Sequence, residues 1–531
     1  MNNILVLDCT LRDGGYVNNN CFGYQNIEKI IQALNESKVD IIECGYIKDT
    51  SVDYSKDITE YKSFESFHEE QGQNLNKNRE YALMILGEEY DIDNLPMSTS
   101  NRNIVRMTFH KKSVEKAIKY AEIIKEKGYK LFVQPTTIMR YSTREIIHLL
   151  KEINKIKPYC VSVVDTFGEM RRKDVLHAAE IFNKYLDKDI AIGFHAHNNL
   201  QLAFSNAIAF IDVLHKKRTV IVDTSIYGMG RGAGNLPTEL LTNYLNENYN
   251  KKYKINSILN IADSIIKNIK VENNWGYSLE YYLSAINSIH PSYVINFMNR
   301  QTLNTIDINN LLNSISYDKK SEYNKEYANE LYNSYNDKEI NDKKSYDELK
   351  KVVNNKNVLL IGPGVSITKH KKQIEKYIND KNVISIAVNN KLMYNTDYIF
   401  VSNKKRYEML NKEDKDKIII TSNIKSVSEN EIIFNYQKSL SRKVGISDNS
   451  LLILLNILSK VTKEVILAGF DGFSLNLDKN FYDSNIKFVL DKNYVKDLNK
   501  FIEKNINEYK KKMSIITITP SKYFKEATKW K

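Results

Sequence analysis

LVLDCTLRDGGYVNNN, residues 5–20, begins as an apolar strand and continues without a break into Arg12, Asp13 and two glycines. A strand that only ends at the surface needs a turn residue such as glycine. It does not need an arginine and an aspartate side by side. The charged pair is explained if this strand ends at a functional site, so the rest of the chain must show which fold builds that site.

Seven further apolar runs follow, and the segments between them carry helical periodicity, as in residues 113–128, 143–156 and 200–216. Eight strands, most of them followed by a helix, within about 250 residues are typical of a (β/α)8 TIM barrel. In that fold the functional residues lie at the C-terminal ends of the strands. The eight runs are NILVLDCT, VDIIECGY, YALMILGE, NIVRMTFH, KLFVQPTT, CVSVVDTF, DIAIGFHAH and TVIVDTSIYG.

A histidine pair ends the seventh run, in GFHAHNN. His195 and His197 are two residues apart, so on a strand their side chains point to the same side. The first and seventh strands flank the eighth in a closed barrel, so Asp13 can add an oxygen ligand. Two imidazoles and one carboxylate leave positions open for substrate and suit Mn²⁺, Mg²⁺, Fe²⁺ or Zn²⁺. An isolated HxH can equally be polar strand surface, but Arg12 and Asp13 favour a metal site.

Five motifs occur in the order LDCTLRDGGY, IIECGY, VVDTFGEM, GFHAHNN and GMGRGAGNLPTELL. Over about residues 1–300 the chain resembles the metallo-aldolase and lyase family that includes 4-hydroxy-2-oxovalerate aldolase, 3-hydroxy-3-methylglutaryl-CoA lyase and isopropylmalate synthase. The resemblance implies that Asp13, His195 and His197 bind a divalent ion, with Mn²⁺ as the first choice and Mg²⁺, Co²⁺ or Zn²⁺ as alternatives. It also implies that Arg12 stabilises an enolate. The implied reaction cleaves a 4-hydroxy-2-oxo acid to pyruvate and an aldehyde, or runs in reverse.

Two tyrosines are candidates for proton transfer. The aldolases have a histidine three residues after the metal-binding aspartate, where this chain has Tyr16. The pKa of a free tyrosine is near 10, so Tyr16 is better suited to donating or relaying a proton than to acting as a base. Tyr281, in WGYSLEYYLSA, matches a tyrosine that closes the aldolase site, or is a packed aromatic residue.

The segment GMGRGAGN, residues 228–235, lacks the strand–helix–strand context of a dinucleotide fingerprint. We therefore expect a loop that closes the metal site. Asn235 at its end is expected to be a further ligand or to support the ligands from behind.

The rest of the chain predicts a second domain. After a barrel with a helical tail at 1–300, residues 301–355 predict a polar helical connector and residues 356–531 an open α/β sheet. GPGVS, AVNN, VGISDNSLLILLNIL and ILAGFDGF resemble sialyltransferase-like and pterin-diphosphokinase-like proteins, which implies a nucleotide or nucleotide-sugar site and a role in surface-polysaccharide biosynthesis. A purely structural glycine turn is the alternative. The expected pocket residues are Gly362, Gly364, Ser366, Asn389 and Asp471.

Composition favours a globular, cytoplasmic protein, which we expect to be a homo-oligomer. No apolar run approaches the roughly 18 residues of a membrane span, and no basic leader precedes the first strand. The formal charge of +12 comes from lysines interleaved along the whole chain, which indicates a solvated surface and no nucleic-acid partner. Without CxxC spacing, buried thiols are predicted for the four cysteines, Cys9, Cys21, Cys44 and Cys160.

Two alternatives to the aldolase remain open. A Claisen-type synthase would condense an acyl-CoA with a 2-oxo acid on the same barrel. The short distance from the barrel to the connector argues against the extra domains that such synthases usually carry. A non-catalytic metal-binding or nucleotide-binding protein would keep the ligands and lack a base, as Tyr16 suggests. Arg12 beside the metal has no evident structural purpose, which favours catalysis.

Overall fold

The chain divides into two compact units in the computed structural model. The first unit comprises Met1–Pro291 with Lys320–Glu322, and the second comprises Ser292–Lys319 with Tyr323–Lys531. The structure describes residues 3–49, 55–100, 102–300, 302–425, 431–441, 449–476, 480–483 and 492–524.

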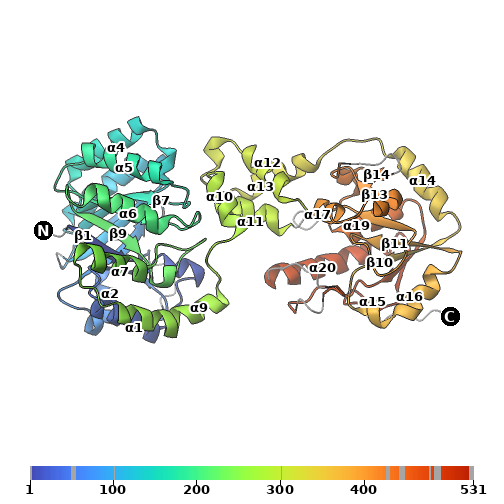
Figure 1. The fold of residues 1–531 in the computed structure, drawn as a ribbon, viewed down its shortest axis with the longest axis horizontal. Helices are drawn as coiled ribbons and strands as arrows, with labels where there is room; N and C mark the ends of the chain where they lie inside the picture. The colour runs from blue at the N-terminus through green and yellow to red at the C-terminus, as the bar shows by residue number, and fades with distance from the viewer. Residues whose placement is uncertain are drawn as a thin grey trace. The chain divides into compact units, whose positions relative to one another are not determined.

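The first unit is the predicted TIM barrel (Figure 1). Its eight strands pair in parallel. The sheet order is β1-β9-β8-β7-β6-β5-β4-β2, and β1 also pairs with β2 through Leu7 and Ile41, which closes the barrel. A two-residue strand, β3 (Glu60–Tyr61), pairs with the end of β2 at Tyr46 and Ile47. The barrel strands are β1 (Ile4–Asp8), β2 (Ile41–Ile47), β4 (Glu80–Leu86), β5 (Asn103–Phe109), β6 (Lys130–Pro135), β7 (Cys160–Asp165), β8 (Ala191–Ala196) and β9 (Val220–Thr224).

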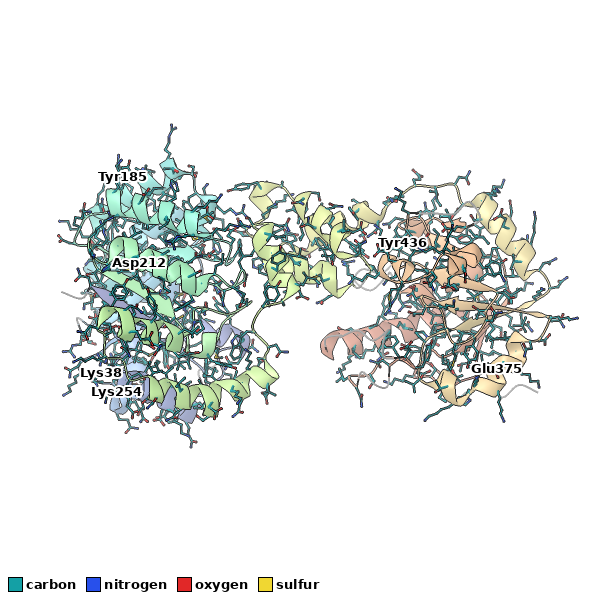
Figure 2. All side chains as sticks on the ribbon, in the orientation of Figure 1. Lys38, Tyr185, Asp212, Lys254, Glu375 and Tyr436 are labelled. Atoms are coloured by element: carbon teal, nitrogen blue, oxygen red, sulfur yellow. The ribbon has the colours of Figure 1, made fainter. Side chains whose placement is uncertain are left out.

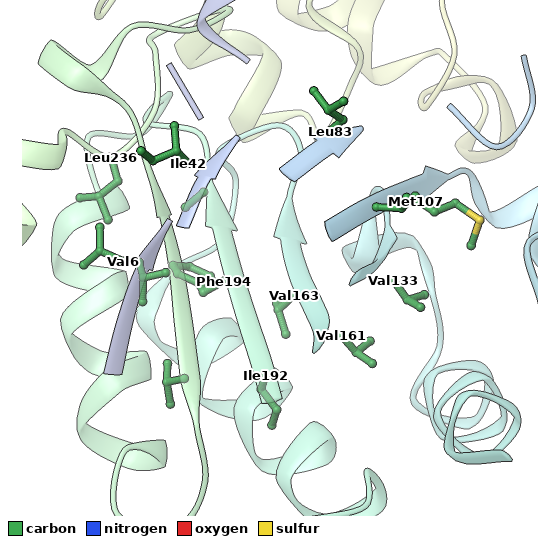
Figure 3. Packing of buried hydrophobic residues seen from close by; sticks show 14 of the residues in the cluster. Val6, Ile42, Leu83, Met107, Val133, Val161, Val163, Ile192, Phe194 and Leu236 are labelled. Atoms are coloured by element: carbon green, nitrogen blue, oxygen red, sulfur yellow. The ribbon is translucent and has the colours of Figure 1, made fainter. Parts of the chain in front are cut away.

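The strands are mostly apolar because both of their faces are buried. Side chains such as Val6, Ile192 and Phe194 pack in the large cluster that includes the helices (Figure 3). Inward side chains, most of them near the N-terminal ends of the strands, form a second, separate cluster that fills the barrel interior. Its buried members are Leu7, Cys9, Ile41, Ala82, Ile104, Phe132, Cys160, Ala191 and Ile221.

Helices surround the barrel, and the three predicted at 113–128, 143–156 and 200–216 are present as α3, α4 and α6. The start of α4 is fixed by a capping box, in which the Ser142 hydroxyl accepts from the Glu145 N–H and the Glu145 carboxylate accepts from the Ser142 N–H. The main helices of this unit are α1 (Tyr24–Glu36), α2 (Phe64–Gln71), α3 (Val114–Glu126), α4 (Thr143–Ile156), α5 (Arg172–Tyr185), α6 (Ala203–Leu214) and α7 (Thr238–Tyr249).

A helical tail follows the barrel. The segment that leads into it is tied to the end of α1, because the Lys254 N–H donates to the Ser37 carbonyl at 3.0 Å; Lys254 and Lys38 are labelled in Figure 2. The tail consists of α8 (Ile255–Ile261), one π-helical turn (Ala262–Ile266), α9 (Lys267–Glu272) and α10 (Leu279–Ile286).

The second unit is an open, seven-stranded parallel sheet. Its order is β14-β13-β12-β11-β10-β15-β16, and buried apolar clusters lie on both of its faces. Five of the strands coincide with apolar runs in the sequence, whereas β14 and β16 were not predicted. The strands are β10 (Asn357–Ile361), β11 (Val383–Val388), β12 (Tyr398–Val401), β13 (Ile418–Thr421), β14 (Ile432–Phe434), β15 (Glu464–Ala468) and β16 (Ser514–Thr517).

Helices connect these strands and also precede them. The nine residues of α19, SLLILLNIL, are almost entirely buried, which explains their apolar sequence. The helices are α11 (Pro291–Asn299), α12 (Thr305–Asn313), α13 (Lys325–Asn336), α14 (Lys343–Val353), α15 (Ser366–Lys369), α16 (Lys371–Ile378), α17 (Lys404–Glu408), α18 (Tyr436–Ser439), α19 (Ser450–Leu458) and α20 (Lys492–Tyr509).

The cysteine prediction is correct for three residues and wrong for one. Cys9, Cys44 and Cys160 are buried free thiols, but Cys21 is exposed. It follows Asn19 and Asn20, which both have positive φ and form a surface turn. Across the described residues, no helix is both long enough and apolar enough to span a bilayer.

Candidate metal centre

The structure brings Asp13, His195 and His197 together at the C-terminal end of the barrel. Asp13 Oδ2 lies 3.9 Å from Nε2 of His195 and 3.9 Å from Nε2 of His197. All three side chains are buried, and one ligand atom from each lies within 4.8 Å of the others. In the described parts of the chain, no other set of three acidic, histidine or cysteine side chains meets this condition.

His195 is oriented by a carboxylate behind it. Its Nδ1 lies 2.9 Å from Asp223 Oδ2, and Asp223 also accepts from Arg106. Burial alone would raise the pKa of Asp223, but Arg106 and the bond to His195 lower it below its ordinary value. The ionised carboxylate therefore holds the proton of His195 on Nδ1, which leaves the Nε2 lone pair facing Asp13.

Arg12 is fixed on two sides. Its Nη1 donates to Asp13 Oδ1 at 2.7 Å, and its Nε donates to Glu43 Oε2 at 2.8 Å. The same Glu43 oxygen accepts from Arg106 Nη1 at 2.6 Å. Burial would raise the pKa of Asp13, but Arg12 and the two histidines hold it well below its usual range. The arginine in LRDGG is therefore a rigid cation beside the Asp13 carboxylate.

This buried network carries an excess negative charge. Arg12 and Arg106 contribute two positive charges, whereas Asp13, Glu43 and Asp223 contribute three negative charges. Burial lowers the pKa of His197 to about 3, so that ring is neutral at pH 7. An uncompensated buried charge costs several kcal/mol. A divalent cation together with one substrate carboxylate would balance this charge, so the donor set fits such an ion.

Asn235 supports the ligand carboxylate through its amide nitrogen. Nδ2 donates to Asp13 Oδ2 at 2.6 Å and to the Met229 carbonyl at 3.1 Å. Oδ1 is buried without a hydrogen-bond partner among the described residues. In this orientation Asn235 holds the same Asp13 oxygen that faces the two histidines, and so restrains the carboxylate.

Both candidate tyrosines border the loop at residues 228–235. The ring of Tyr16 is 42% exposed, and the guanidinium carbon of Arg231 lies 5.0 Å from its centroid. Tyr281, near the start of α10, packs against the loop, because a Cβ atom at Gly232 would lie 3.5 Å from its Cδ1 atom. Burial raises the pKa of Tyr281, which favours its neutral, proton-donating form.

The sequence reasoning missed the residues that support the ligands. Glu43, Arg106 and Asp223 each lie two residues after a member of the apolar barrel cluster, so they form the next inward layer toward the C-terminal end. The signal was a single charge inside an apolar strand, in IIECGY, NIVRMTFH and TVIVDT.

In the second unit, the predicted pocket residues are only partly brought together. Gly364, Asn389 and Asp471 line a cavity of about 370 Å³, whereas Gly362 and Ser366 are not among its lining residues. The Ser366 N–H and hydroxyl both donate to the Asp471 carboxylate. The helix start that was expected to bind an anion therefore already faces an internal carboxylate.

The two glycines of the GPG turn have a packing role. A Cβ atom at Gly362 would lie 2.7 Å from the Gly469 carbonyl oxygen, and one at Gly364 would lie 2.5 Å from it. The turn after β10 can therefore approach the turn after β15 only because both positions lack a side chain.

Comparison with known proteins gives matches to the barrel region. Residues 3–265 match the HMGL-like family. The 4-hydroxy-2-oxovalerate aldolase of Geobacillus genomosp. 3 is 27% identical over 241 residues, covering 45% of this chain and 69% of that protein. The oxaloacetate decarboxylase of Mycobacterium tuberculosis is 23% identical over 237 residues, covering 45% of this chain and 68% of that protein.

A solved structure also matches this region. The N-terminal domain of a candidate aldolase from Bacteroides vulgatus is 28% identical, with a TM-score of 0.48, and the match covers 56% of this chain and 96% of that one.

Proposed function

We propose that the barrel is a divalent-metal-dependent aldolase that cleaves a 4-hydroxy-2-oxo acid to pyruvate and an aldehyde, or catalyses the reverse reaction. The observation that carries this proposal is the rigid Arg12 guanidinium, 2.7 Å from Asp13 and beside the histidine pair. Buried charges of this kind are costly and add little to stability. The similarity to 4-hydroxy-2-oxovalerate aldolases supports a lyase.

Asp13, His195 and His197 would hold the ion, for which we propose Mn²⁺, with Mg²⁺, Co²⁺ or Zn²⁺ as alternatives. The fit rests on the three buried donors and on the single excess negative charge around them. When bound, such an ion supplies Lewis-acid polarisation of a 2-oxo acid.

The residues of the chain have separate tasks in the cleavage. The C4 hydroxyl loses its proton, the C3–C4 bond breaks to give an aldehyde, and its electron pair forms the enolate of pyruvate. Arg12 stabilises the charge on the enolate oxygen, because its bonds to Asp13 and Glu43 keep it in place before the charge develops. C3 of the enolate then takes up a proton. We propose Tyr16 as the relay for proton transfer, with Tyr281 as the alternative.

A second candidate reaction is the decarboxylation of a 2-oxo diacid. The similarity to an oxaloacetate decarboxylase favours it, and so does the tyrosine at position 16. Loss of CO₂ from C4 of oxaloacetate leaves the same pyruvate enolate, which needs only a proton at C3. This reaction needs no base to begin, so Tyr16 would suffice as a proton donor.

Pyruvate release tests these proposals. The full chain, incubated with Mn²⁺, is offered 4-hydroxy-2-oxo acids and, separately, oxaloacetate, and pyruvate is followed with a coupled dehydrogenase. Release from the hydroxy acids supports the aldolase, and release from oxaloacetate alone supports the decarboxylase. Consumption of an acyl-CoA with a 2-oxo acid would instead support a Claisen-type synthase. Mn²⁺ binding without any turnover would favour a non-catalytic protein.

For the second unit, we propose that the cavity of about 370 Å³ binds a nucleotide or a nucleotide sugar. It is bordered by residues that follow β10 and β15, where the strand order of the sheet reverses. Ligands of open parallel sheets bind at this position. Arg300, Lys405 and Arg406 line the cavity and supply positive charge for phosphate groups. A role in surface-polysaccharide biosynthesis depends on this proposal.

Calorimetry on the full chain with CMP, UDP and their sugar conjugates tests nucleotide binding directly. Arg406→Gln should weaken the binding at least 10-fold if the phosphate groups lie at this end of the cavity. No heat of binding with any of these compounds would remove the proposal, whatever the barrel does.

A further inference from the structure

The loop at residues 228–235 is held tightly over the metal centre. A Cβ atom at Gly230 would come within 2.4 Å of Asn235 Nδ2, and one at Gly232 within 2.9 Å of Asn199 Oδ1. Gly232 and Gly234 also have φ values of +76° and +85°, which L side chains rarely adopt. The loop therefore has a backbone that only glycine permits at these positions, and its shape is fixed.

Arg231 is the exception within this loop. Its neighbours Met229 and Ala233 are buried, and Asn235 is bonded to the ligand Asp13. Arg231 carries the one charged side chain of the loop, and it is exposed. Within the part of the chain that the structure describes, its side chain has no acidic partner within 4.0 Å; its guanidinium lies over the Tyr16 ring, 5.0 Å from the ring centroid.

The loop brings this cation to the entrance of the candidate site. Asn235, four residues further along, holds Asp13, and the Ala233 N–H donates to Asn199 at 3.0 Å. Tyr281 borders the loop at Gly232. Arg12 is buried, whereas Tyr16 and Arg231 are exposed. A substrate whose C1 carboxylate and C2 oxygen lie near Arg12 would therefore extend from C3 toward the exposed side, where Tyr16 and Arg231 lie.

We propose that Arg231 is a specificity-determining residue that binds a second anionic group, a carboxylate or a phosphate, on the aldehyde part of the substrate. This inference rests on the proposed aldolase activity and names its substrate class: 4-hydroxy-2-oxo acids that carry an anion beyond C4. A guanidinium on a rigid loop can bind either group through two parallel hydrogen bonds. An arginine that only covered Tyr16 would confer no preference for charge.

The reverse reaction, condensation of pyruvate with an aldehyde acceptor, tests the preference for an anionic acceptor on the full chain with Mn²⁺. Two pairs of acceptors compare an anionic with a neutral aldehyde: glyoxylate with glycolaldehyde, which is similar in size, and glyceraldehyde 3-phosphate with glyceraldehyde, which lacks the phosphate. We expect kcat/KM to favour the anionic member of at least one pair by 10-fold or more. Preference within the first pair identifies a carboxylate, and preference within the second a phosphate.

Variants separate recognition from a structural effect. Arg231→Gln should reduce the ratio of kcat/KM for the anionic acceptor to kcat/KM for the neutral acceptor to within about 2-fold of unity. Arg231→Lys should retain part of this preference, because lysine keeps the charge and loses the paired hydrogen bonds. Arg144→Gln, which changes an exposed arginine on α4, is the matched control and should leave the ratio unchanged.

A binding measurement removes the dependence on turnover. Calorimetry compares 2-oxoglutarate with 2-oxohexanoate, which lacks the second carboxylate, on the native chain and on Arg231→Gln. The native chain should bind 2-oxoglutarate at least 5-fold more tightly than 2-oxohexanoate, and Arg231→Gln should not show this difference. Condensation without any charge preference would overturn the inference and leave the aldolase intact. No condensation and no 2-oxo acid binding would overturn both.

Discussion

The two parallel sheets of this chain place their polar groups differently. In the barrel, charged residues lie inside the strands themselves: Glu43, Arg106 and Asp223 are buried and paired with one another or with Arg12. In the second unit the middle strands β10 and β15 are buried and apolar at their centres, and the polar groups follow in the loops, as with Asn389 and Asp471.

This difference separates two kinds of site. Burying several charges costs more free energy than filling the same volume with apolar side chains. The layer of Glu43, Arg106 and Asp223 is therefore best explained by chemistry that needs a preorganised electrostatic field. Polar residues in loops at a sheet edge cost little and can bind a ligand without such a network. The barrel is therefore the candidate for catalysis, and the second unit is the candidate for binding alone.

Arg106→Met should have the largest effect on stability. The change leaves Glu43 and Asp223 without a shared buried cation, so we expect the barrel to lose about 3 to 5 kcal/mol of unfolding free energy. Urea unfolding of the full chain measures it. Lys371→Met removes an exposed ion pair with Glu375, 3.7 Å away on the same helix of the second unit, and provides the contrast, with an expected loss of about 1 kcal/mol or less. Equal losses would contradict the distinction between the two sheets.

Tyr16→Phe should lower pyruvate turnover by about 10² to 10⁴ if this hydroxyl relays the proton, with little change in Mn²⁺ affinity. Tyr281→Phe is the matched variant at the other side of the loop and should then be nearly silent. The reverse pattern would assign the proton transfer to Tyr281. If both variants remain fully active, the proton-transfer scheme is wrong.

Asp8 provides a smaller, pH-dependent effect inside the barrel. Burial raises its pKa from 3.8 to about 6, so the folded state favours the protonated form. The resulting stability is fully present below about pH 4 and is lost as the pH rises through 6. Relative to the native chain, Asp8→Asn should therefore gain up to about 3 kcal/mol between pH 4 and pH 7. Urea unfolding across that range measures the gain, and a pH-independent difference would show that Asp8 is not buried as a neutral acid.

Ser366→Ala should have the smallest effect. It removes one hydroxyl bond to Asp471 while the backbone N–H keeps the other, so the expected loss is about 1 kcal/mol. If nucleotides bind in the cavity and not at the turn, their affinity should change less than 3-fold, as calorimetry would record. A decrease in nucleotide affinity of 10-fold or more would show that the phosphate binds at the turn at Ser366.

The sequence predicted the barrel well for a physical reason. Strands that are buried on both faces must be largely apolar, so all eight runs were visible, and the spacing of the two histidines placed them on one face. Strand β14 has only three residues, and β16 begins with an exposed serine and is not buried throughout, so neither gave a comparable signal.

The network behind the ligands could not be predicted in the same way. Arg106 lies 63 residues from Glu43 and 117 residues from Asp223 in the chain, and only closure of the barrel joins them. A lone charge in an apolar strand indicates that a partner exists but does not identify it. The bond between Ser366 and Asp471 likewise spans 105 residues, so the sequence offered a helix start and gave no sign of its internal carboxylate.

The most direct test of the central claim uses the full chain and His197→Ala side by side. Mn²⁺ binding is measured by calorimetry and pyruvate release by a coupled dehydrogenase, while circular dichroism reports the fold. The account predicts that the native chain binds Mn²⁺ and releases pyruvate from a 4-hydroxy-2-oxo acid, and that the folded variant does neither. Full Mn²⁺ binding and full turnover by His197→Ala would contradict the metal centre and the function proposed for it.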